Sequence, residues 1–303
     1  MKIPVIFGPT ASGKSKLANI LLEEFSNIHF IVADSRKIYR YMDIGTNKPP
    51  ENLRKYFSML DIRDPDEHFS AADFARIAEK EIKEILLTGN IPVIIGGTVL
   101  YLKALFEGLF ESPPIDGKIR ENLRERLKSE GIRKLFEELK NVDPEAAQRI
   151  HPNDWFRILR ALEVYYQTGK TITHWQKEKI TIKSRFEPVY FGLYRTRENL
   201  YQRINQRFDK MMEAGFLDEV KRLLAMGYSP DLPSLNTIGY KELIQYLLNE
   251  ISLERAVLIS KRRTRILARR QIYFSRSLTP PVKWISVKEG YKDILNQLRT
   301  WIA

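Results

Sequence analysis

The sequence predicts an α/β fold whose parallel sheet is interrupted by an all-helical insertion. Short apolar runs typical of buried strands alternate with segments of helical periodicity, as in strands joined by helical crossovers. Strands are expected at 3–7, 28–33, 57–62, 91–95, 188–193 and 282–287. Residues 116–176 instead show apolar stripes at helical spacing and nothing that resembles a strand. The expected domains are an α/β core (1–114 and 182–303) and a helical insertion domain (115–181), divided at Ser112-Pro113-Pro114.

The first predicted strand leads into an eight-residue motif that fits the phosphate-loop pattern G-x-x-x-x-G-K-[ST]. The motif consists of Gly8, Pro9, Thr10, Ala11, Ser12, Gly13, Lys14 and Ser15. Its glycines let successive N–H groups point inward, and the helix that follows directs its positive end to the same point. Lys14 would neutralise the outer phosphate, and the Ser15 hydroxyl would hold Mg²⁺. A strand before the motif and helical spacing after it favour a P-loop NTPase-like core over a turn matched by chance.

The second strand, 28–33, ends at Asp34-Ser35. Ligands of open α/β sheets lie beyond the carboxyl ends of the strands, so Asp34 is expected in the crevice of the phosphate loop. A carboxylate beside phosphates is repelled unless a metal or a chemical role compensates, which favours chemistry over the alternative of a cap or turn residue. Residues 36–50 follow as a loop-rich segment with little core to bury.

Helix signals continue along the chain. Ser70 is expected to begin a helix that ends at Gly89. The strand 91–95 then ends in Gly96-Gly97-Thr98, where a hydrolysing NTPase usually places an Mg²⁺-holding Asp. The Gly-Gly-Thr turn instead lets a ligand approach the backbone closely, before a short apolar helix at 101–109.

In the helical insertion, Asp143 and Asp154 are expected to cap helices, the first of them followed by proline at the first helical position. Beyond the insertion, Arg203 and Arg207 lie one helical turn apart. Such a pair is either a solvated face or a clamp for a phosphate, and the sequence leaves both open.

The segment from Arg255 to Arg276 contains eight basic residues and no acidic one. Arg262, Arg265, Arg269 and Arg276 are expected on one helical stripe, with Ile259, Ile266 and Tyr273 as its packed edge. A run of positive charges of this length favours a helix that binds a nucleic-acid phosphate backbone over a helix with a solvated charged face.

Composition agrees with a polyanionic partner. Fifty Lys and Arg against 38 Asp and Glu give a formal charge of +12. This charge favours nucleic acid over a membrane as the partner. The alternative is a basic surface that binds no partner. No apolar run approaches the roughly 20 residues that span a bilayer. The absence of cysteine excludes disulfides, thiolate metal sites and a cysteine nucleophile. The N-terminus enters a strand by Ile3, leaving no room for a signal peptide, so a cytoplasmic location is expected.

Ten stretches of the sequence together resemble one known family, the bacterial tRNA dimethylallyltransferases, nearly end to end. They are GPTASGKS (8–15), DSRKIYRYMDIGTNKP (34–49), LDIRDP (60–65), SAADF (70–74), GGTVLYLKAL (96–105), DPEAAQRIHPND (143–154), RALEV (160–164), RINQRF (203–208), IGYKE (238–242) and ARRQ (268–271). The first two together are the most specific, because ordinary phosphate-loop kinases lack the second. The resemblance implies transfer of a dimethylallyl group from dimethylallyl diphosphate to N6 of the adenosine immediately 3′ of the anticodon, with release of diphosphate.

The resemblance also implies residue roles. Thr10 and Arg207 would hold the diphosphate together with Lys14 and the loop amides, and Asp34 would be the general base. Contacts to the tRNA anticodon stem-loop are implied for Asp34, Ser35, Arg36, Lys37, Thr98, Arg120, Phe156, Arg157, Ile158, Leu159, Arg160, Asn236, Thr237, Ile238, Gly239, Tyr240, Lys241, Arg269, Arg270, Gln271, Ile272, Tyr273, Phe274, Ser275 and Arg276. The expected cofactor is Mg²⁺, and a monomer is expected.

Three positions depart from the family's usual pattern. Val99 follows Gly-Gly-Thr where a smaller residue is common, which would alter the width of a channel. Phe156, in place of a polar residue, and the charged pair Arg36-Lys37 would change RNA contacts without changing the chemistry. Eukaryotic relatives add a C-terminal zinc finger, which a chain without cysteine cannot have.

Two other classes of function remain open from the residues. One is a small-molecule enzyme, either a phosphate-loop kinase or an isopentenyltransferase acting on free adenine nucleotide. The other is a non-catalytic RNA-binding module that uses a nucleotide as a switch.

Overall fold

The computed structural model describes residues 1–108, 116–177, 185–287 and 291–302. The chain divides into two compact units, which are described separately. The first unit comprises Met1–Glu107 and Lys183–Ala303, and the second comprises Gly108–Ile182. The domain boundaries expected after residues 114 and 181 fall outside the described residues.

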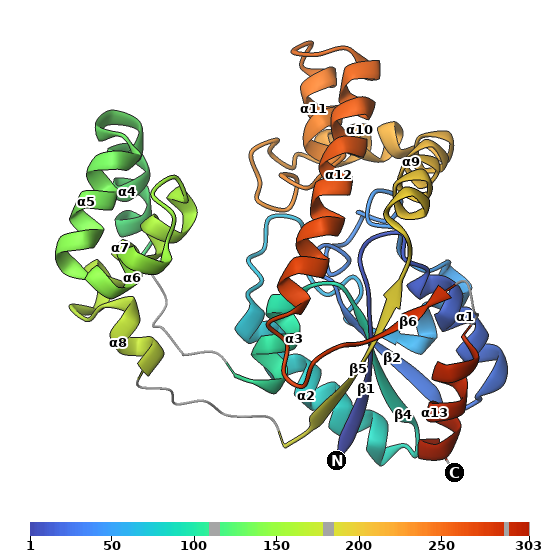
Figure 1. Cartoon of the computed structure of the whole chain (residues 1–303). Coiled ribbons are helices and arrows are strands. Elements are labelled where there is room, and N and C mark those ends of the chain that lie inside the picture. Colours follow the sequence, from blue (N-terminus) through green and yellow to red (C-terminus); the bar gives the residue numbers. More distant parts are fainter. Residues whose placement is uncertain (109–115, 178–184, 288–290, 303) are drawn as a thin grey trace. The chain divides into compact units, whose positions relative to one another are not determined.

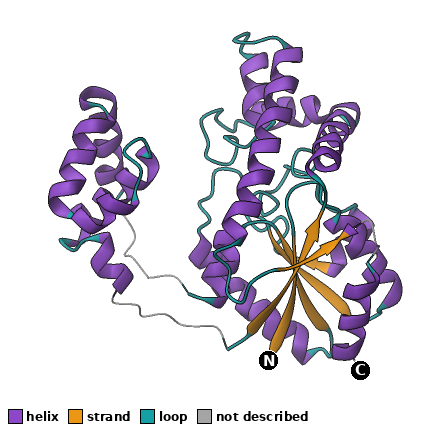
Figure 2. Cartoon of the chain, in the orientation of Figure 1, coloured by secondary structure: helices purple, strands orange, loops and turns teal. Residues whose placement is uncertain are grey.

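The first unit contains a six-stranded sheet in the order β3-β2-β4-β1-β5-β6, and each strand pairs with its neighbours in parallel (Figure 2). Its strands are β1 (Lys2–Phe7), β2 (Ile28–Ala33), β3 (Phe57–Ser58), β4 (Ile91–Gly96), β5 (Glu187–Tyr194) and β6 (Lys283–Ser286). Helices cover both faces of a parallel sheet, which is why these strands are nearly continuous apolar runs. The expected α/β class is therefore confirmed.

The third strand is shorter than the sequence predicts. The expected strand covered 57–62, whereas β3 ends at Ser58. Met59 and Asp61 have φ angles of 67° and 54°, and these left-handed conformations end the extended strand.

Helices α2 (Ala71–Leu87) and α3 (Val99–Phe106) lie on one side of the sheet, and α1 (Lys14–Glu24) and α13 (Lys292–Ile302) lie on the other (Figure 1). The expected start of α2 is confirmed by a capping box, in which Ser70 accepts from the Asp73 N–H and the Asp73 carboxylate accepts from the Ser70 N–H. Four further helices follow β5, namely α9 (Arg197–Glu213), α10 (Phe216–Ala225), α11 (Tyr240–Leu247) and α12 (Leu253–Ser275).

The segment 36–50 is loop-rich as expected, and a 3₁₀ helix (Glu51–Tyr56) follows it directly. The expectation that this segment buries little core is wrong. Ile38, Tyr39 and Met42 are buried in a cluster with apolar side chains of α9, α10 and α11. The reason is that these later helices, nearly 200 residues away in sequence, provide the apolar surface that the segment itself lacks.

Two buried polar groups fix this segment. The Glu219 carboxylate accepts from the backbone N–H groups of Asp43, Ile44 and Gly45 at 2.9, 2.7 and 3.0 Å. The Lys48 ammonium donates to the Tyr39 carbonyl at 2.6 Å and also pairs with the carboxylates of Asp43 and Asp61. These bonds satisfy backbone groups that no regular element pairs.

The described part of the second unit is wholly helical, with α4 (Gly117–Glu130), α5 (Ile132–Val142), α6 (Pro144–Arg149), α7 (Trp155–Thr168) and α8 (Ile172–Lys177). The expected caps are confirmed, because Asp143 accepts from Ala146 N–H at 3.0 Å and Asp154 from Arg157 N–H at 3.2 Å. Within the described residues of both units, no helix is long and apolar enough to cross a membrane.

Candidate active site

The loop that carries the phosphate-loop motif (8–15), for which we keep the name phosphate loop, joins β1 to α1 at the carboxyl edge of the sheet. Gly13 takes a φ of 114°, a left-handed conformation that favours glycine, and α1 begins at the next residue. The Lys14 ammonium lies back over the loop and donates to the carbonyls of Gly8 and Pro9 at 2.7 and 3.0 Å. The Ser12 hydroxyl is buried and has no hydrogen-bond partner among the described residues. A buried hydroxyl without a partner is costly, so it marks a place where a ligand oxygen can bind.

Three side chains that lie at least 180 residues further along the chain contact this loop from outside. Arg195 Nε donates to the Ser12 carbonyl at 2.7 Å, and Arg203 Nε donates to the Ala11 carbonyl at 3.1 Å. The Gln271 amide accepts from Thr10 N–H at 3.0 Å and donates to the Gly97 carbonyl at 3.1 Å. The loop conformation therefore depends on α9 and α12 as well as on its own glycines.

Asp34 lies at the same edge, because β4 separates β2 from β1 and all three strands end together. Asp34 Oδ1 accepts from Arg36 N–H at 2.9 Å, the turn contact that the sequence left as an alternative. Its Oδ2 makes no hydrogen bond with the described residues, so it remains available as an acceptor. Thr98, the residue directly before α3, accepts from Ser35 N–H at 3.2 Å.

Positive charge converges on Asp34. Burial lowers the pKa of Lys14 to about 7 and that of Lys37 to about 8, and it also lowers the pKa of Arg207. The Asp34 charge acts in the opposite direction on all three groups, so each of them lies close enough to this carboxylate to interact with it. One carboxylate among three desolvated cations leaves an excess positive charge, as a site for a bound anion requires.

The two arginines that lie one turn apart on α9 have different environments. Arg203 holds the backbone of the phosphate loop, whereas the buried Nε of Arg207 has no partner among the described residues. An unpartnered guanidinium N–H beside Lys14 and Asp34 favours the phosphate-clamp interpretation for Arg207, and neither arginine forms a simple solvated face.

The Ser15 hydroxyl, in the first turn of α1, is exposed and makes no hydrogen bond with the described residues. No group of three or more acidic or histidine side chains within the described residues could hold a metal ion by itself. Mg²⁺ usually takes only one or two protein ligands and completes its shell with phosphates and water. The residues present therefore fit a metal held by Ser15 and a bound phosphate.

The residues of α12 with an implied RNA contact divide by exposure. Arg269, Arg270, Tyr273, Phe274 and Arg276 are exposed, while Ser275 is buried and Ile272 half-buried. The Gln271 side chain is already used in its contact with the phosphate loop, described above. An RNA contact of Gln271 stays a prediction.

The packed edge that the sequence predicts for α12 is wrong. Tyr273 is 64% exposed, and Ile259 and Ile266 are only half-buried. The helix instead packs through the small residues Ala256, Ser260, Ala268 and Ser275. Small side chains let the helix backbones approach closely, so the larger apolar residues are left toward the surface.

The segment 236–241 is only partly available for contact. Asn236 and Lys241 are exposed and Thr237 and Ile238 are half-buried, but Gly239 and Tyr240 are buried. Tyr240 donates to the Glu219 carboxylate at 2.6 Å, so it is a structural residue and not an RNA ligand. Arg36 Nη1 donates to the Pro233 carbonyl at 3.1 Å, which brings the Asp34–Lys37 segment close to this one.

In the second unit, α4 and α7 carry the other residues with implied RNA contacts. Phe156 and Arg157 are exposed, whereas Ile158 and Leu159 are buried in the core of the unit and are corrected here to packing residues. Arg120 and Arg160 both pair with Glu163, with N–O distances of 3.2 and 3.4 Å.

Sequence reasoning missed Arg195 and the support that Arg203 and Gln271 give to the phosphate loop. Their contacts join residues that are more than 180 positions apart, and no spacing rule signals such pairs. The lowered pKa of Lys37 was also not expected, since the sequence marks this residue as an implied RNA contact and as a charged departure from a pattern.

Known proteins match this chain over nearly all of its length. The family model described as IPP transferase matches residues 37–278. A tRNA dimethylallyltransferase of Thermotoga neapolitana is 46% identical over 98% of each chain, and one of Geobacter sulfurreducens is 44% identical over 97% of this chain and 94% of its own.

Solved structures agree. The tRNA isopentenylpyrophosphate transferase of Bacillus halodurans superimposes with a TM-score of 0.71 at 35% identity, over 99% of this chain and 96% of its own. A eukaryotic dimethylallyltransferase acting on tRNA gives a TM-score of 0.79 at 29% identity, over 98% of this chain and 77% of its own. With a family model that matches most of the sequence and relatives of this identity over its whole length, the chain belongs to the IPP transferase family.

Proposed function

We propose that this enzyme transfers the dimethylallyl group of dimethylallyl diphosphate to N6 of the adenosine 3′-adjacent to the anticodon of tRNA, and releases diphosphate. Family membership and the names of its relatives support prenyl transfer to tRNA. The observation that supports the donor and the chemistry is the pair of buried donors without partners, the Ser12 hydroxyl and the Nε of Arg207, together with cations that interact with the Asp34 carboxylate beside the phosphate loop.

The reaction needs a base for the acceptor and charge stabilisation for the leaving group. The lone pair of an exocyclic adenine amine is delocalised into the ring, so the amine must lose a proton as its bond to the allylic carbon forms. We assign that proton to Oδ2 of Asp34, because the hydrogen bond from Arg36 N–H uses the other carboxylate oxygen. The electron pair of the breaking C–O bond goes to the diphosphate.

The phosphate loop then stabilises the diphosphate charge. Loop N–H groups, the Lys14 ammonium, the Thr10 hydroxyl and the unpartnered Nε of Arg207 donate to its oxygens. Mg²⁺, held by Ser15 and the phosphates, would supply further charge neutralisation when bound. No residue is needed to activate water, which agrees with a β4 that ends in glycine and not in aspartate.

Access to the base requires that the RNA be opened. The target base is stacked in the anticodon loop, so it must be flipped into the crevice that contains Asp34. Single-stranded loops are where proteins normally read RNA sequence, and exposed Arg269, Tyr273 and Phe274 on α12 can contact such a loop. We further propose a cytoplasmic monomer.

Three reactions test this proposal. Labelled dimethylallyl diphosphate is offered with unmodified tRNA in the first and with AMP in the second, and the third contains ATP and a small acceptor instead. Label in the tRNA adenosine 3′ of the anticodon is expected. Label in AMP alone would assign a small-molecule prenyltransferase, phosphoryl transfer from ATP would assign a kinase, and no transfer at all would favour an RNA-binding module.

The base is tested by Asp34→Asn, which removes the proton acceptor at nearly constant shape. The single-turnover rate is expected to fall by about 100-fold or more while the Kd for tRNA stays within a factor of about three. Asp218→Asn, which makes the same change at a carboxylate that is 77% exposed and pairs only with Lys221 at the surface, is the matched control. A full single-turnover rate in Asp34→Asn would remove this carboxylate from the proton transfer.

A further inference from the structure

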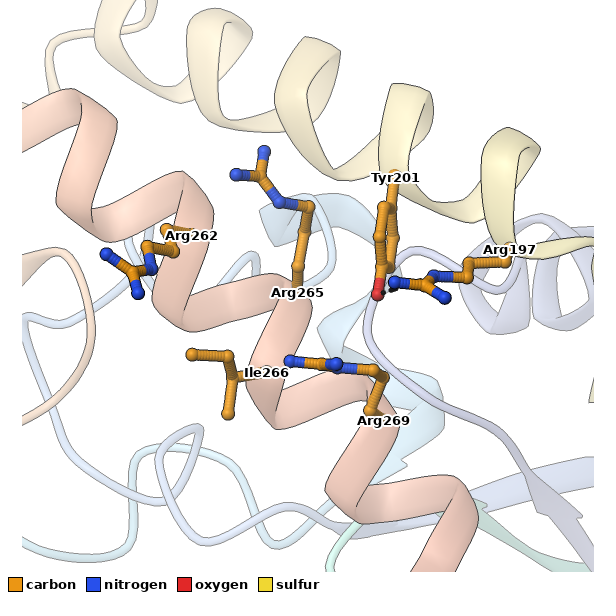
Figure 3. A pocket seen from close by; sticks show the side chains of 6 residues that line it. All are labelled: Arg197, Tyr201, Arg262, Arg265, Ile266 and Arg269. Atoms are coloured by element: carbon orange, nitrogen blue, oxygen red, sulfur yellow. Dashed lines mark hydrogen bonds between the residues drawn. The ribbon is translucent and has the colours of Figure 1, made fainter.

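A cavity lined largely by arginine lies between α9 and α12, apart from the phosphate loop. Its volume is about 240 Å³, and its lining consists of Arg197, Tyr201, Arg262, Arg265, Ile266 and Arg269 (Figure 3). We call this set the arginine pocket. Within the described residues, none of its four arginines pairs with a carboxylate, although both flanking helices carry acidic residues elsewhere.

Tyr201 holds two of these arginines in place. It lies between Arg197 and Arg265 in Figure 3, and their guanidinium carbons lie 5.3 and 5.8 Å from its ring centroid. Arg197 Nε also donates to the Tyr201 hydroxyl at 3.2 Å, and Arg265 Nη1 donates to Asn205 Oδ1 at 2.9 Å. These contacts orient the two guanidinium groups before any ligand arrives, which lowers the entropy cost of binding.

The other two arginines are free. Arg262 and Arg269 are exposed, lie seven residues apart on α12, and make no side-chain hydrogen bond with the described residues. Each guanidinium offers five N–H donors in a planar fork that matches phosphate oxygens. Four like charges around one small cavity repel one another, and a phosphate placed among them replaces repulsion with attraction.

The pocket adjoins the proposed catalytic site. Tyr201 packs with Ala11 of the phosphate loop around the buried side chains of Leu200, Ile204 and Ala268. None of the pocket residues belongs to the loop, so the pocket is a second anion site and not an extension of the first.

The surroundings favour RNA over a free phosphate as the ligand. On α12 the arginine pocket continues into exposed Arg270 and Arg276, and Tyr273 and Phe274 there are 64% and 45% exposed. Basic groups alternating with exposed aromatic rings match a single strand, whose phosphates follow the charges and whose bases stack on the rings. A small anion would use the pocket and leave these rings and cations without a role.

We propose that the arginine pocket binds consecutive phosphates of the substrate RNA and so holds the strand beside the phosphate loop. This inference rests on the proposed function, since it assumes an RNA substrate. It assigns RNA contacts to Arg197, Tyr201, Arg262 and Arg265, none of which is among the positions that the resemblance to the family implies.

The test measures the affinity of the full chain for a labelled anticodon stem-loop RNA as a function of salt, with no prenyl donor present. In the double variant Arg197→Gln/Arg262→Gln, binding at 0.1 M salt is expected to weaken by about tenfold or more. The slope of log K against log salt is expected to decrease in magnitude by about 0.7 for each phosphate that the variant no longer neutralises. Arg262→Lys keeps the charge, so it is expected to keep the slope while losing part of the affinity.

Lys83→Gln is the matched control, because it removes one exposed positive charge from the last turns of α2, which run toward the opposite edge of the sheet. Its slope is expected to equal that of the unchanged chain. Binding of inorganic diphosphate, measured by calorimetry, is expected to be the same in the double variant and the unchanged chain.

Two results would overturn the proposal. An RNA salt slope equal in the double variant and in Lys83→Gln would show that the pocket does not meet RNA phosphates. Weakened diphosphate binding with unchanged RNA binding would instead assign the pocket to a free anion. Because no prenyl donor is used, failure of prenyl transfer to RNA is a separate result that leaves this measurement valid.

Discussion

The carboxylate of Glu219 is a buried polar group that fixes the backbone of residues 43–45, and its removal gives a sharp prediction. Glu219 is 1% exposed and accepts four hydrogen bonds, three from the N–H groups of residues 43–45 and one from the Tyr240 hydroxyl at 2.6 Å. Burial and the nearby Glu219 charge raise the pKa of Tyr240 well above its usual value, so the phenol stays a neutral donor at any pH the protein would meet.

The expected cost follows from these four bonds. In Glu219→Ala, three N–H groups and a hydroxyl lose their acceptor in a site closed to water, at about 1–3 kcal/mol for each group. Allowing for partial relaxation, the free energy of unfolding of the first unit should fall by about 5 kcal/mol, much of the 5–15 kcal/mol typical of a domain. Glu219→Gln keeps one acceptor oxygen, and the tyrosine hydroxyl can rotate to accept from the new amide, so about 2–3 kcal/mol is expected.

Urea unfolding monitored by circular dichroism measures these values, and hydrogen exchange of the amides of residues 43–45 reports the loop directly. Asp218→Ala is the matched control on the same helix, because its side chain is 77% exposed and makes only a surface ion pair with Lys221. It should change stability by less than about 0.5 kcal/mol. If Glu219→Ala stays within about 1 kcal/mol of the unchanged chain, with amides 43–45 still protected, the four bonds do not have the value assigned to them.

Three further predictions concern the site. Because the pKa of Lys14 is lowered to about 7 and a bound diphosphate would raise it, binding takes up a proton above that pH. In Mg²⁺-free buffer the affinity for dimethylallyl diphosphate should therefore fall by up to tenfold per pH unit above 7, and in Lys14→Arg the affinity should not fall for this reason. Calorimetry in two buffers measures the affinity and the proton uptake. An affinity independent of pH in the unchanged chain would refute the prediction. Gln271→Ala removes one hydrogen bond to the phosphate loop, at Thr10 N–H, and one to the Gly97 carbonyl, so the KM for dimethylallyl diphosphate should rise about five- to tenfold while the Kd for RNA stays constant; the reverse outcome would make Gln271 an RNA contact. Charge reversal at Arg269 and Arg270 should weaken RNA binding and flatten its salt dependence, and an unchanged slope would separate α12 from the RNA.

The sequence predicted those parts of the fold that depend on local pattern. Strand β2 and the capping box at Ser70 lie where periodicity and cap residues placed them, because these signals act within a few residues. The loop motif after β1 and Asp34 after β2 also lie at the same edge of the sheet as expected, since parallel strands end at one edge.

Contacts between distant segments were not predictable in the same way. The segment 36–50 looks polar and irregular by itself, and only the later helices explain why Ile38 and Met42 are buried. The expected packed edge of α12 failed for a related reason. Periodicity weights large apolar residues such as Tyr273, whereas close helix contact selects small ones such as Ala268, which carry little hydrophobic signal.

These small residues have a consequence for how α12 tolerates substitution. The arginines project from a backbone held near its neighbours by Ala256, Ser260 and Ala268, each fully buried. Replacement of one outer arginine therefore changes a single charge and leaves the position of the helix unchanged. A single bulky replacement on the inner side would displace the whole row of charges at once, together with the amide that grips the loop.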